Sequence, residues 1–316
     1  MKQLAVAALM CGIVAGPVSA QTTVVADVRA AIAKNDLASA ERTAREQLTN
    51  PDSAAVGLEA LSWVGRGAFA AGQLDLAARI ARETQSLAEG ALRGRPIDTV
   101  PGLPTAIGAS LEVQAQVLAA QGARSDGVYL LTRALERYGN TSIHARLQKN
   151  VHLLGLVGTP AVPLDAPAFL GTERATVASL KGHPLVLFFW AHWCPDCKLQ
   201  GPILAKIQSE FASDGLRIVA PTQLYGYAAD ANRAASPDEE RTHILAVRER
   251  YYPDLASVPM PFSQENFKRY GVSSTPTVVL VDREGIVRAY NPGRMSEEAL
   301  RLAIRAMIAP SRGQNP

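Results

Sequence analysis

The sequence predicts an all-α domain followed by an α/β sandwich. From about residue 22 to residue 150, alanine is abundant and apolar residues recur at helical spacing, as in Val25, Val28 and Ile32. The second half contains a continuous apolar run at residues 184–190, which suits a strand buried on both faces. With 316 residues, 47% of them hydrophobic and 19% charged, the chain is long enough for two domains with sizeable cores.

Residues 1–20 predict a cleavable signal peptide. Lys2 supplies a positive charge, an uncharged apolar run follows, and Val18-Ser19-Ala20 places small residues before the polar Gln21. The run is shorter than the roughly 20 residues of a membrane-spanning helix. We therefore expect an exported protein, in the periplasm by preference, with an extracellular location or membrane anchoring by an uncleaved segment as alternatives. The net charge of +3 is spread thinly, which argues against a nucleic-acid partner.

Residues 21–154 form the expected helical domain, and three of its segments are similar to one another. Residues 34–40, 71–77 and 121–127 each place a turn-prone residue between two helical stretches and then a small residue. This pattern resembles tetratricopeptide helix pairs. The resemblance implies a concave surface for a protein partner; an ordinary alanine-rich helical domain is the alternative.

A Gly- and Pro-rich linker sets the domain boundary at about residue 155, so the second domain is expected at residues 155–316. Its signals alternate between strand and helix and end with a hairpin and a helix, as an α/β sandwich requires. The expected elements are a strand at 184–190, a helix from Pro195 to about residue 212, a strand at 216–220, a helix from Ser236 to about Tyr251, hairpin strands at 277–281 and 286–290, and a helix from Ser296.

The chemistry is expected at Cys194 and Cys197, the two cysteines left after removal of the leader with Cys11. Disulfide exchange needs one thiolate nucleophile and a second thiol close enough to resolve the mixed disulfide. At the start of a helix, the partial positive charge favours a thiolate on Cys194, and Cys197 follows one turn inside. A structural role is disfavoured, because closing so small a loop removes little entropy from the unfolded chain.

The neighbouring residues are expected to modulate this pair. Pro195 fits the first helical position, where no N–H is needed. Lys198 and a protonated His192 would lower the pKa of Cys194, whereas Asp196 would raise it. The direction of the net shift in this pKa therefore stays open.

Residues 189–198 resemble the active-site segment of thioredoxin-fold proteins, and are most similar to the exported TlpA/ResA-like thiol–disulfide oxidoreductases. Pro202 stands where that family kinks its active-site helix, and residues 274–277 look like its cis-proline loop. The resemblance implies that Pro276 faces the cysteines in the cis form and that Thr275 offers backbone hydrogen bonds to an extended substrate. Trp193 is expected to be a partly exposed contact surface.

Two positions depart from the family pattern. Phe188 and Gln200 stand where thioredoxins or TlpA/ResA-like proteins have an acid, so the usual proton acceptor for Cys197 is missing. The stretch between Cys194 and Pro276 is longer than in a plain thioredoxin, and its extra helix resembles the central insertion of the TlpA/ResA group.

The sequence therefore predicts a protein-disulfide oxidoreductase that needs no soluble cofactor and acts on exported protein thiols or disulfides with a redox partner protein. The main alternative is a helical-repeat adaptor whose second domain is a scaffold. A zinc site is disfavoured, because it wants four ligands and only His183 and His192 lie near the single cysteine pair. A peroxidase of the peroxiredoxin type is disfavoured by Ala191, where those enzymes have threonine.

Overall fold

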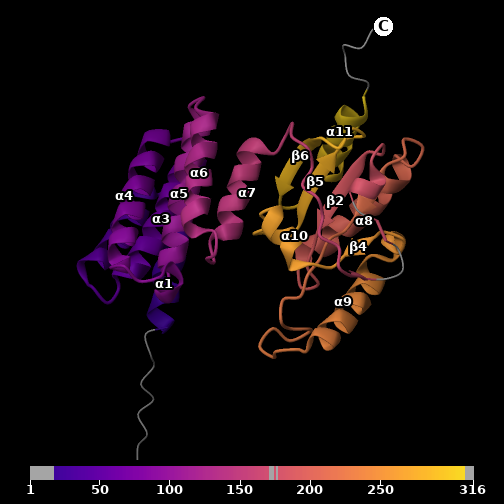
Figure 1. The fold of residues 1–316 in the computed structure, drawn as a ribbon. Coiled ribbons are helices and arrows are strands. Elements are labelled where there is room, and N and C mark those ends of the chain that lie inside the picture. The colour runs from indigo at the N-terminus through magenta and orange to yellow at the C-terminus, as the bar shows by residue number, and fades with distance from the viewer. Residues whose placement is uncertain (1–17, 171–173, 176, 310–316) are drawn as a thin grey trace, which may run out of the picture. The chain divides into compact units, whose positions relative to one another are not determined.

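The structure is a computed structural model that describes residues 18–170, 174–175 and 177–309. The predicted signal segment lies outside these residues, except that the first helix begins at Val18. Contacts divide the chain into two compact units, Met1–Val113 and Gln114–Pro316, which are described one at a time (Figure 1). Within the described part of the chain, no helix combines the length and the apolar character that a membrane span requires.

The elements follow the predicted order, with an all-helical first part and a mixed second part. The helices are α1 (Val18–Ala33), α2 (Leu37–Glu46), α3 (Ala54–Ala70), α4 (Leu74–Leu92), α5 (Leu103–Ala120), α6 (Arg124–Tyr138), α7 (His144–Gly155), α8 (Pro195–Glu210), α9 (Pro237–Tyr251), α10 (Gln264–Arg269) and α11 (Glu297–Ile308). The strands are β1 (Phe169–Leu170), β2 (Leu185–Phe189), β3 (Arg217–Val219), β4 (Met260–Pro261), β5 (Thr277–Val281) and β6 (Val287–Pro292).

The first unit is built from helices that pack on α3. Helices α1, α2 and α4 all contact α3, and short turns connect α1 to α2 and α3 to α4. Small residues and aliphatic residues alternate in the core, so the helices approach closely. The core consists of Val28, Ala40, Ala44, Ala60, Leu61, Val64 and Ile80.

The three similar sequence segments adopt the same turn. Asn35, Gly72 and Gly122 stand at equivalent places and all have positive φ, at 60°, 74° and 90°. The small residue that follows in each copy is buried, and at Gly127 a Cβ would lie 2.6 Å from the carbonyl oxygen of Ala115. The repeat is therefore structural, because each copy needs a left-handed turn residue and then a small packing residue. Its tetratricopeptide character stays a prediction.

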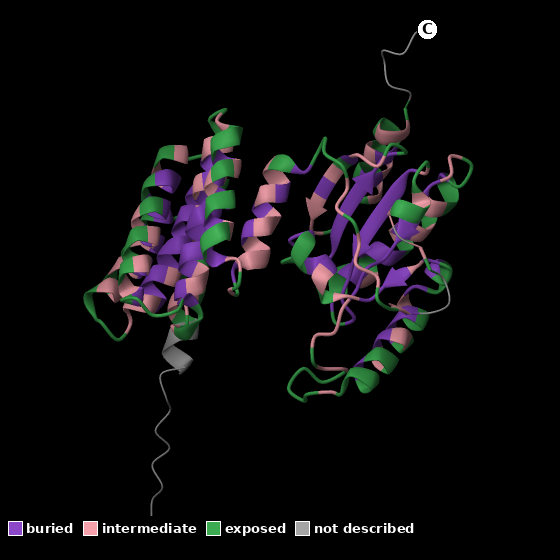
Figure 2. Ribbon diagram, in the orientation of Figure 1, coloured by how far each residue is buried: buried purple, intermediate pink, exposed green. Residues whose placement is uncertain are grey.

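The second unit is built on a four-stranded sheet in the order β3-β2-β5-β6. Strand β2 runs parallel to β3 and antiparallel to β5, and β5 forms the predicted hairpin with β6. All five residues of β2 and all five of β5 are buried, as the continuous apolar runs predict (Figure 2). A separate pair, β1 with β4, is antiparallel.

Successive β2 residues face two different cores. Phe188 lies in the core that holds residues of α8, α9 and α11, whereas Phe189 lies in the core that holds Phe267 and Tyr270. The sheet is thus covered on both faces, which makes the second part of the chain the α/β sandwich that the sequence predicts.

Helix α7 also packs on this sandwich, against α10 and β6. His152 Nε2 lies 2.7 Å from the carbonyl oxygen of Arg269. At Gly271, whose φ is +58°, a Cβ would lie 2.2 Å from the backbone nitrogen of Lys149. The second unit therefore includes helices that precede residue 155, and the proposed domain boundary at that residue remains a prediction.

Candidate active site

The sheet register brings the two predicted site segments together. Phe189, at the end of β2, pairs with Thr277, at the start of the antiparallel β5. The chain that leaves β2 toward Cys194 and the loop that enters β5 through Pro276 therefore meet at one edge of the sheet. The peptide bond between Thr275 and Pro276 is cis, as the resemblance implied.

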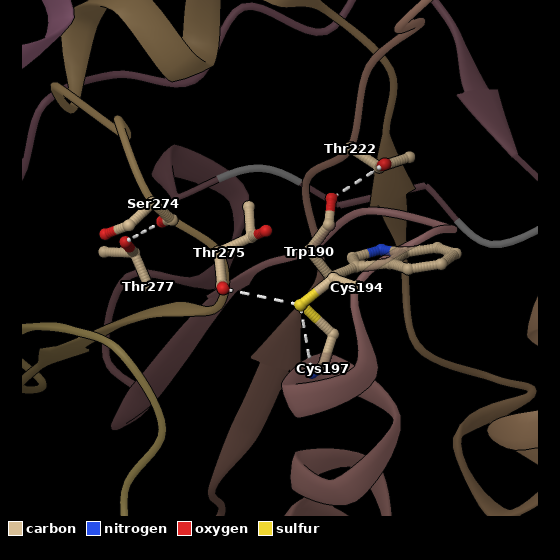
Figure 3. The surroundings of a disulfide bond; sticks show 7 residues. All are labelled: Trp190, Cys194, Cys197, Thr222, Ser274, Thr275 and Thr277. Carbon is tan, nitrogen blue, oxygen red and sulfur yellow. Dashed lines mark hydrogen bonds between the residues drawn. A yellow bond between two sulfur atoms is a disulfide. The ribbon is translucent and has the colours of Figure 1, made fainter. Parts of the chain in front are cut away.

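Cys194 and Cys197 form a disulfide at the start of α8 (Figure 3). Their Cα atoms are 5.3 Å apart. Cys194 is the N-cap of α8, and its sulfur accepts a hydrogen bond of 3.1 Å from the backbone N–H of Cys197. In the reduced state this donor and the helix N-terminus would stabilise a thiolate on Cys194.

The backbone of Thr275 lies next to the sulfur of Cys194. Its carbonyl oxygen lies 3.4 Å from the sulfur of Cys194, as Figure 3 shows. Its hydroxyl is buried and has no hydrogen-bond partner in the part of the chain that the structure describes. Trp193 is 43% exposed and packs edge-on against Tyr225, with ring centroids 5.6 Å apart. The contact of Trp193 and Thr275 with an extended substrate stays a prediction.

His192 is fully buried beneath this surface. Its Nε2 lies 3.3 Å from Oε1 of Glu240, and its ring also contacts Tyr225, Tyr227 and His243. Glu240 is itself buried, and its carboxylate accepts hydrogen bonds from the backbone N–H groups of Tyr225 (2.6 Å) and Gly226 (2.9 Å). The carboxylate thus fixes the loop between β3 and α9, the insertion loop at residues 220–236, to α9. It also places this loop beside the segment that carries the cysteines.

Burial changes the expected role of His192. Desolvation lowers the pKa of His192, and this outweighs the favourable charge of Glu240. The imidazole is therefore neutral at pH 7, so the condition under which His192 would lower the pKa of Cys194, a protonated ring, is not met.

We expect the free energy of unfolding to fall as the pH drops below about 6.5, because the unfolded chain then protonates His192 whereas the folded chain resists protonation. In this window the unfolded state binds more protons, so stability rises with pH. Urea unfolding of the wild type and of His192→Asn, followed from about pH 7.5 to about pH 5, measures this effect. The variant should lose less stability on acidification. An equal pH dependence in the two proteins would contradict the assignment.

The remaining predicted modulators lie around the N-terminus of α8. Pro195 is its first residue, and both Pro195 and Asp196 are exposed. Lys198 is half-buried, with its ammonium group 4.6 Å from the centre of the Tyr251 ring. The structure thus places all three within two turns of the disulfide, whereas their effect on the thiolate stays a prediction.

The two positions that lack the family's acid are both buried. Phe188 lies in the core, and its ring centroid is 6.3 Å from that of Tyr252. Oε1 of Gln200 accepts a hydrogen bond of 2.8 Å from the backbone N–H of Met295. Gln200 therefore fastens α8 to the loop before α11, a role that a neutral amide fulfils without placing a charge in the core.

Sequence reasoning missed two residues that shape the site. The Thr222 hydroxyl donates a hydrogen bond of 3.0 Å to the Trp190 carbonyl, and no sequence signal marks it. Glu240 did carry a signal, because it lies four and seven residues before Ile244 and Val247, which are also buried. A carboxylate on the apolar face of a helix indicates a buried partner.

Comparison with known proteins agrees with this geometry. Residues 172–308 match the family model described as a thioredoxin-like domain. This part of the chain is a thioredoxin-like domain. Among curated proteins, the thioredoxin-like protein YneN of Bacillus subtilis is 27% identical over 141 residues, which cover 43% of this chain and 74% of YneN.

Two further relatives are named for thiol–disulfide chemistry. The thiol-disulfide oxidoreductase ResA of Bacillus subtilis is 27% identical, over 43% of this chain and 70% of ResA. The thiol:disulfide interchange protein DsbE of Pseudomonas aeruginosa is 29% identical, over 42% of this chain and 64% of DsbE. These matches cover less than half of the chain.

Proposed function

We propose that the protein is a thiol–disulfide oxidoreductase that exchanges disulfides with exported protein cysteines through Cys194 and Cys197. The observation that carries the proposal is the disulfide at the N-terminus of α8, with Cys194 as the helix cap beside the cis Thr275–Pro276 bond. The names of ResA and DsbE support the same reaction class.

In the reducing direction, the thiolate of Cys194 attacks one sulfur of a substrate disulfide. A mixed disulfide forms, and the other substrate sulfur leaves as a thiolate that takes up a proton. Cys197 then loses its proton to solvent and attacks the sulfur of Cys194, which releases the second substrate thiol. The substrate gains two electrons and the pair becomes the disulfide; a partner protein dithiol restores the reduced pair. The oxidising direction runs these steps in reverse.

The test is stoichiometric exchange with a synthetic peptide that contains one disulfide. The reduced protein should convert the peptide to its dithiol while one Cys194–Cys197 disulfide forms per peptide, as mass spectrometry of both species can show. A protein that stays reduced beside an intact excess of the peptide would leave the adaptor alternative in place.

We also propose that the helical part binds a protein partner and that the protein works outside the cytoplasm. The repeated turns at Asn35, Gly72 and Gly122 support the first proposal, because repeated helix pairs commonly present a continuous binding surface. The apolar leader at residues 1–20 supports the second proposal, as does the chemistry itself, since disulfide exchange with folding proteins belongs to oxidising compartments.

A further inference from the structure

A pocket of about 530 Å³ is lined by Trp193 and Lys198, the residues that flank the Cys194–Cys197 pair in the sequence. His192 and Trp193, which precede Cys194, and Lys198 of α8 form part of its wall, and the insertion loop and α9 form the rest. The lining consists of His192, Trp193, Lys198, Tyr227, Ala228, Ala229, Ala231, His243, Ala246, Val247, Arg250 and Tyr251. A substrate whose cysteine reaches Cys194 therefore places neighbouring residues at the mouth of this pocket.

The charge of the lining is one-sided. Lys198 and Arg250 line the pocket, and no aspartate or glutamate does. Both cations lie over the ring of Tyr251, at 4.6 Å and 5.3 Å from its centre. Neither has an ion-pair partner among the described residues, so both remain able to pair with an incoming anion.

The buried carboxylate of Glu240 does not cancel this charge at the surface. Glu240 lies under the pocket, is 1% exposed and is occupied by the backbone N–H groups of Tyr225 and Gly226. Asp230 stands in the same loop but is exposed and outside the lining. The side chains that line the pocket are therefore cationic, aromatic or small and apolar, and the exposed Asp230 stands between the lining residues Ala229 and Ala231.

His192 provides a second, independent sign of a ligand. Its side chain is 0% exposed and lines the pocket. Nε2 lies 3.3 Å from the Glu240 carboxylate, whereas Nδ1 has no hydrogen-bond partner in the described structure. Buried polar atoms are rarely left unsatisfied, so such a group at a pocket wall indicates a missing acceptor or donor.

We propose that this pocket recognises an acidic side chain, Asp or Glu, that lies near the reacting cysteine of the protein substrate. Lys198 and Arg250 bind the carboxylate, and the rings of Trp193, Tyr227 and Tyr251 pack against the apolar part of the same segment. The inference rests on the proposed disulfide exchange and adds a substrate preference to it.

The experiment compares peptides that differ only in charge. Each peptide carries one cysteine in a mixed disulfide with 2-mercaptoethanol, and a Glu or a Gln is placed in turn at each position within three residues of that cysteine. Rates of exchange with the reduced protein are measured by chromatography. At the best position the Glu peptide should react roughly threefold to tenfold faster than its Gln counterpart, and high salt should reduce this ratio.

The variant K198Q/R250Q should bring the ratio of the two rates close to one. Arg241→Gln is the matched control, because Arg241 also lies on α9 but is outside the pocket and pairs with Asp238. It should keep the preference for Glu.

Two results would overturn the pocket proposal and leave the oxidoreductase proposal intact. In the first, the Glu and Gln peptides react at nearly equal rates with the wild type at every position. In the second, the Glu peptide still reacts faster with K198Q/R250Q. Peptide binding to the oxidised protein tests the pocket proposal separately from the oxidoreductase proposal. Peptides with serine in place of cysteine should still bind more tightly when they carry Glu, by a similar factor. Absence of exchange with every peptide, together with retained Glu-selective binding, would reject the redox function alone.

Discussion

Cys194→Ser should reduce the rate of peptide disulfide exchange by roughly a thousandfold or more, because a serine hydroxyl is almost never ionised at neutral pH. Cys197 cannot replace Cys194, because it lies inside α8 rather than at the helix cap. The helix N-terminus and the Cys197 N–H would then stabilise an anion that does not form. The measurement is the reduction rate of a peptide disulfide by the variant under the conditions used for the wild type.

Cys197→Ser is the matched control for this result. It keeps Cys194 as the nucleophile and removes the resolving thiol, so a mixed disulfide between Cys194 and the peptide should accumulate and be visible by mass spectrometry. If Cys194→Ser retained exchange, or if the adduct formed on Cys197 in the wild type, the assignment of nucleophile and resolving thiol would be wrong.

Gly271→Ala should destabilise the second unit by about 3 kcal/mol. Gly271 has φ of +58°, where an alanine costs about 1–2 kcal/mol. Its Cβ would also lie 2.2 Å from the backbone nitrogen of Lys149 in α7, and overpacking of this kind costs about 1–3 kcal/mol. Urea unfolding followed by tryptophan fluorescence gives the difference.

Gly285→Ala separates the two costs. Gly285 also has positive φ, at +84°, but its Cβ would meet nothing within 4 Å. This variant should lose only the conformational part, about 1 kcal/mol. Equal losses in the two variants would show that α7 does not press on Gly271 and that helices before residue 155 are not an integral part of the second unit.

The second half of the fold was predictable because its elements carry local signals. Continuous apolar runs predicted β2 and β5, and Ser236 with Pro237 predicted the start of α9, where a capping box is found. The docking of α7 on the sandwich could not be predicted, because it depends on contacts such as that between His152 and the Arg269 carbonyl, which are far apart in sequence.

The candidate site also has features that the sequence predicted and features that it could not predict. The positions of Cys194, Cys197 and Pro276 follow from spacing and from the resemblance, and the structure brings them to one sheet edge. The charge of His192 could not be predicted, since it depends on burial beneath an insertion loop whose sequence has no regular pattern. The same loop, together with α8 and α9, lines the cationic pocket. Both helices were predictable, whereas their meeting at one pocket depends on the path of the loop between them.

A redox titration of the Cys194/Cys197 pair in glutathione buffers tests the central claim most directly. Trp193, adjacent to Cys194 and 43% exposed, and the buried Trp190 provide the fluorescence signal. We expect one reversible two-electron transition, with a potential between about −270 mV, typical of a thioredoxin-like reductant, and about −120 mV, typical of an oxidant of folding proteins. Absence of any reversible two-electron transition would contradict the account and favour the helical-repeat adaptor.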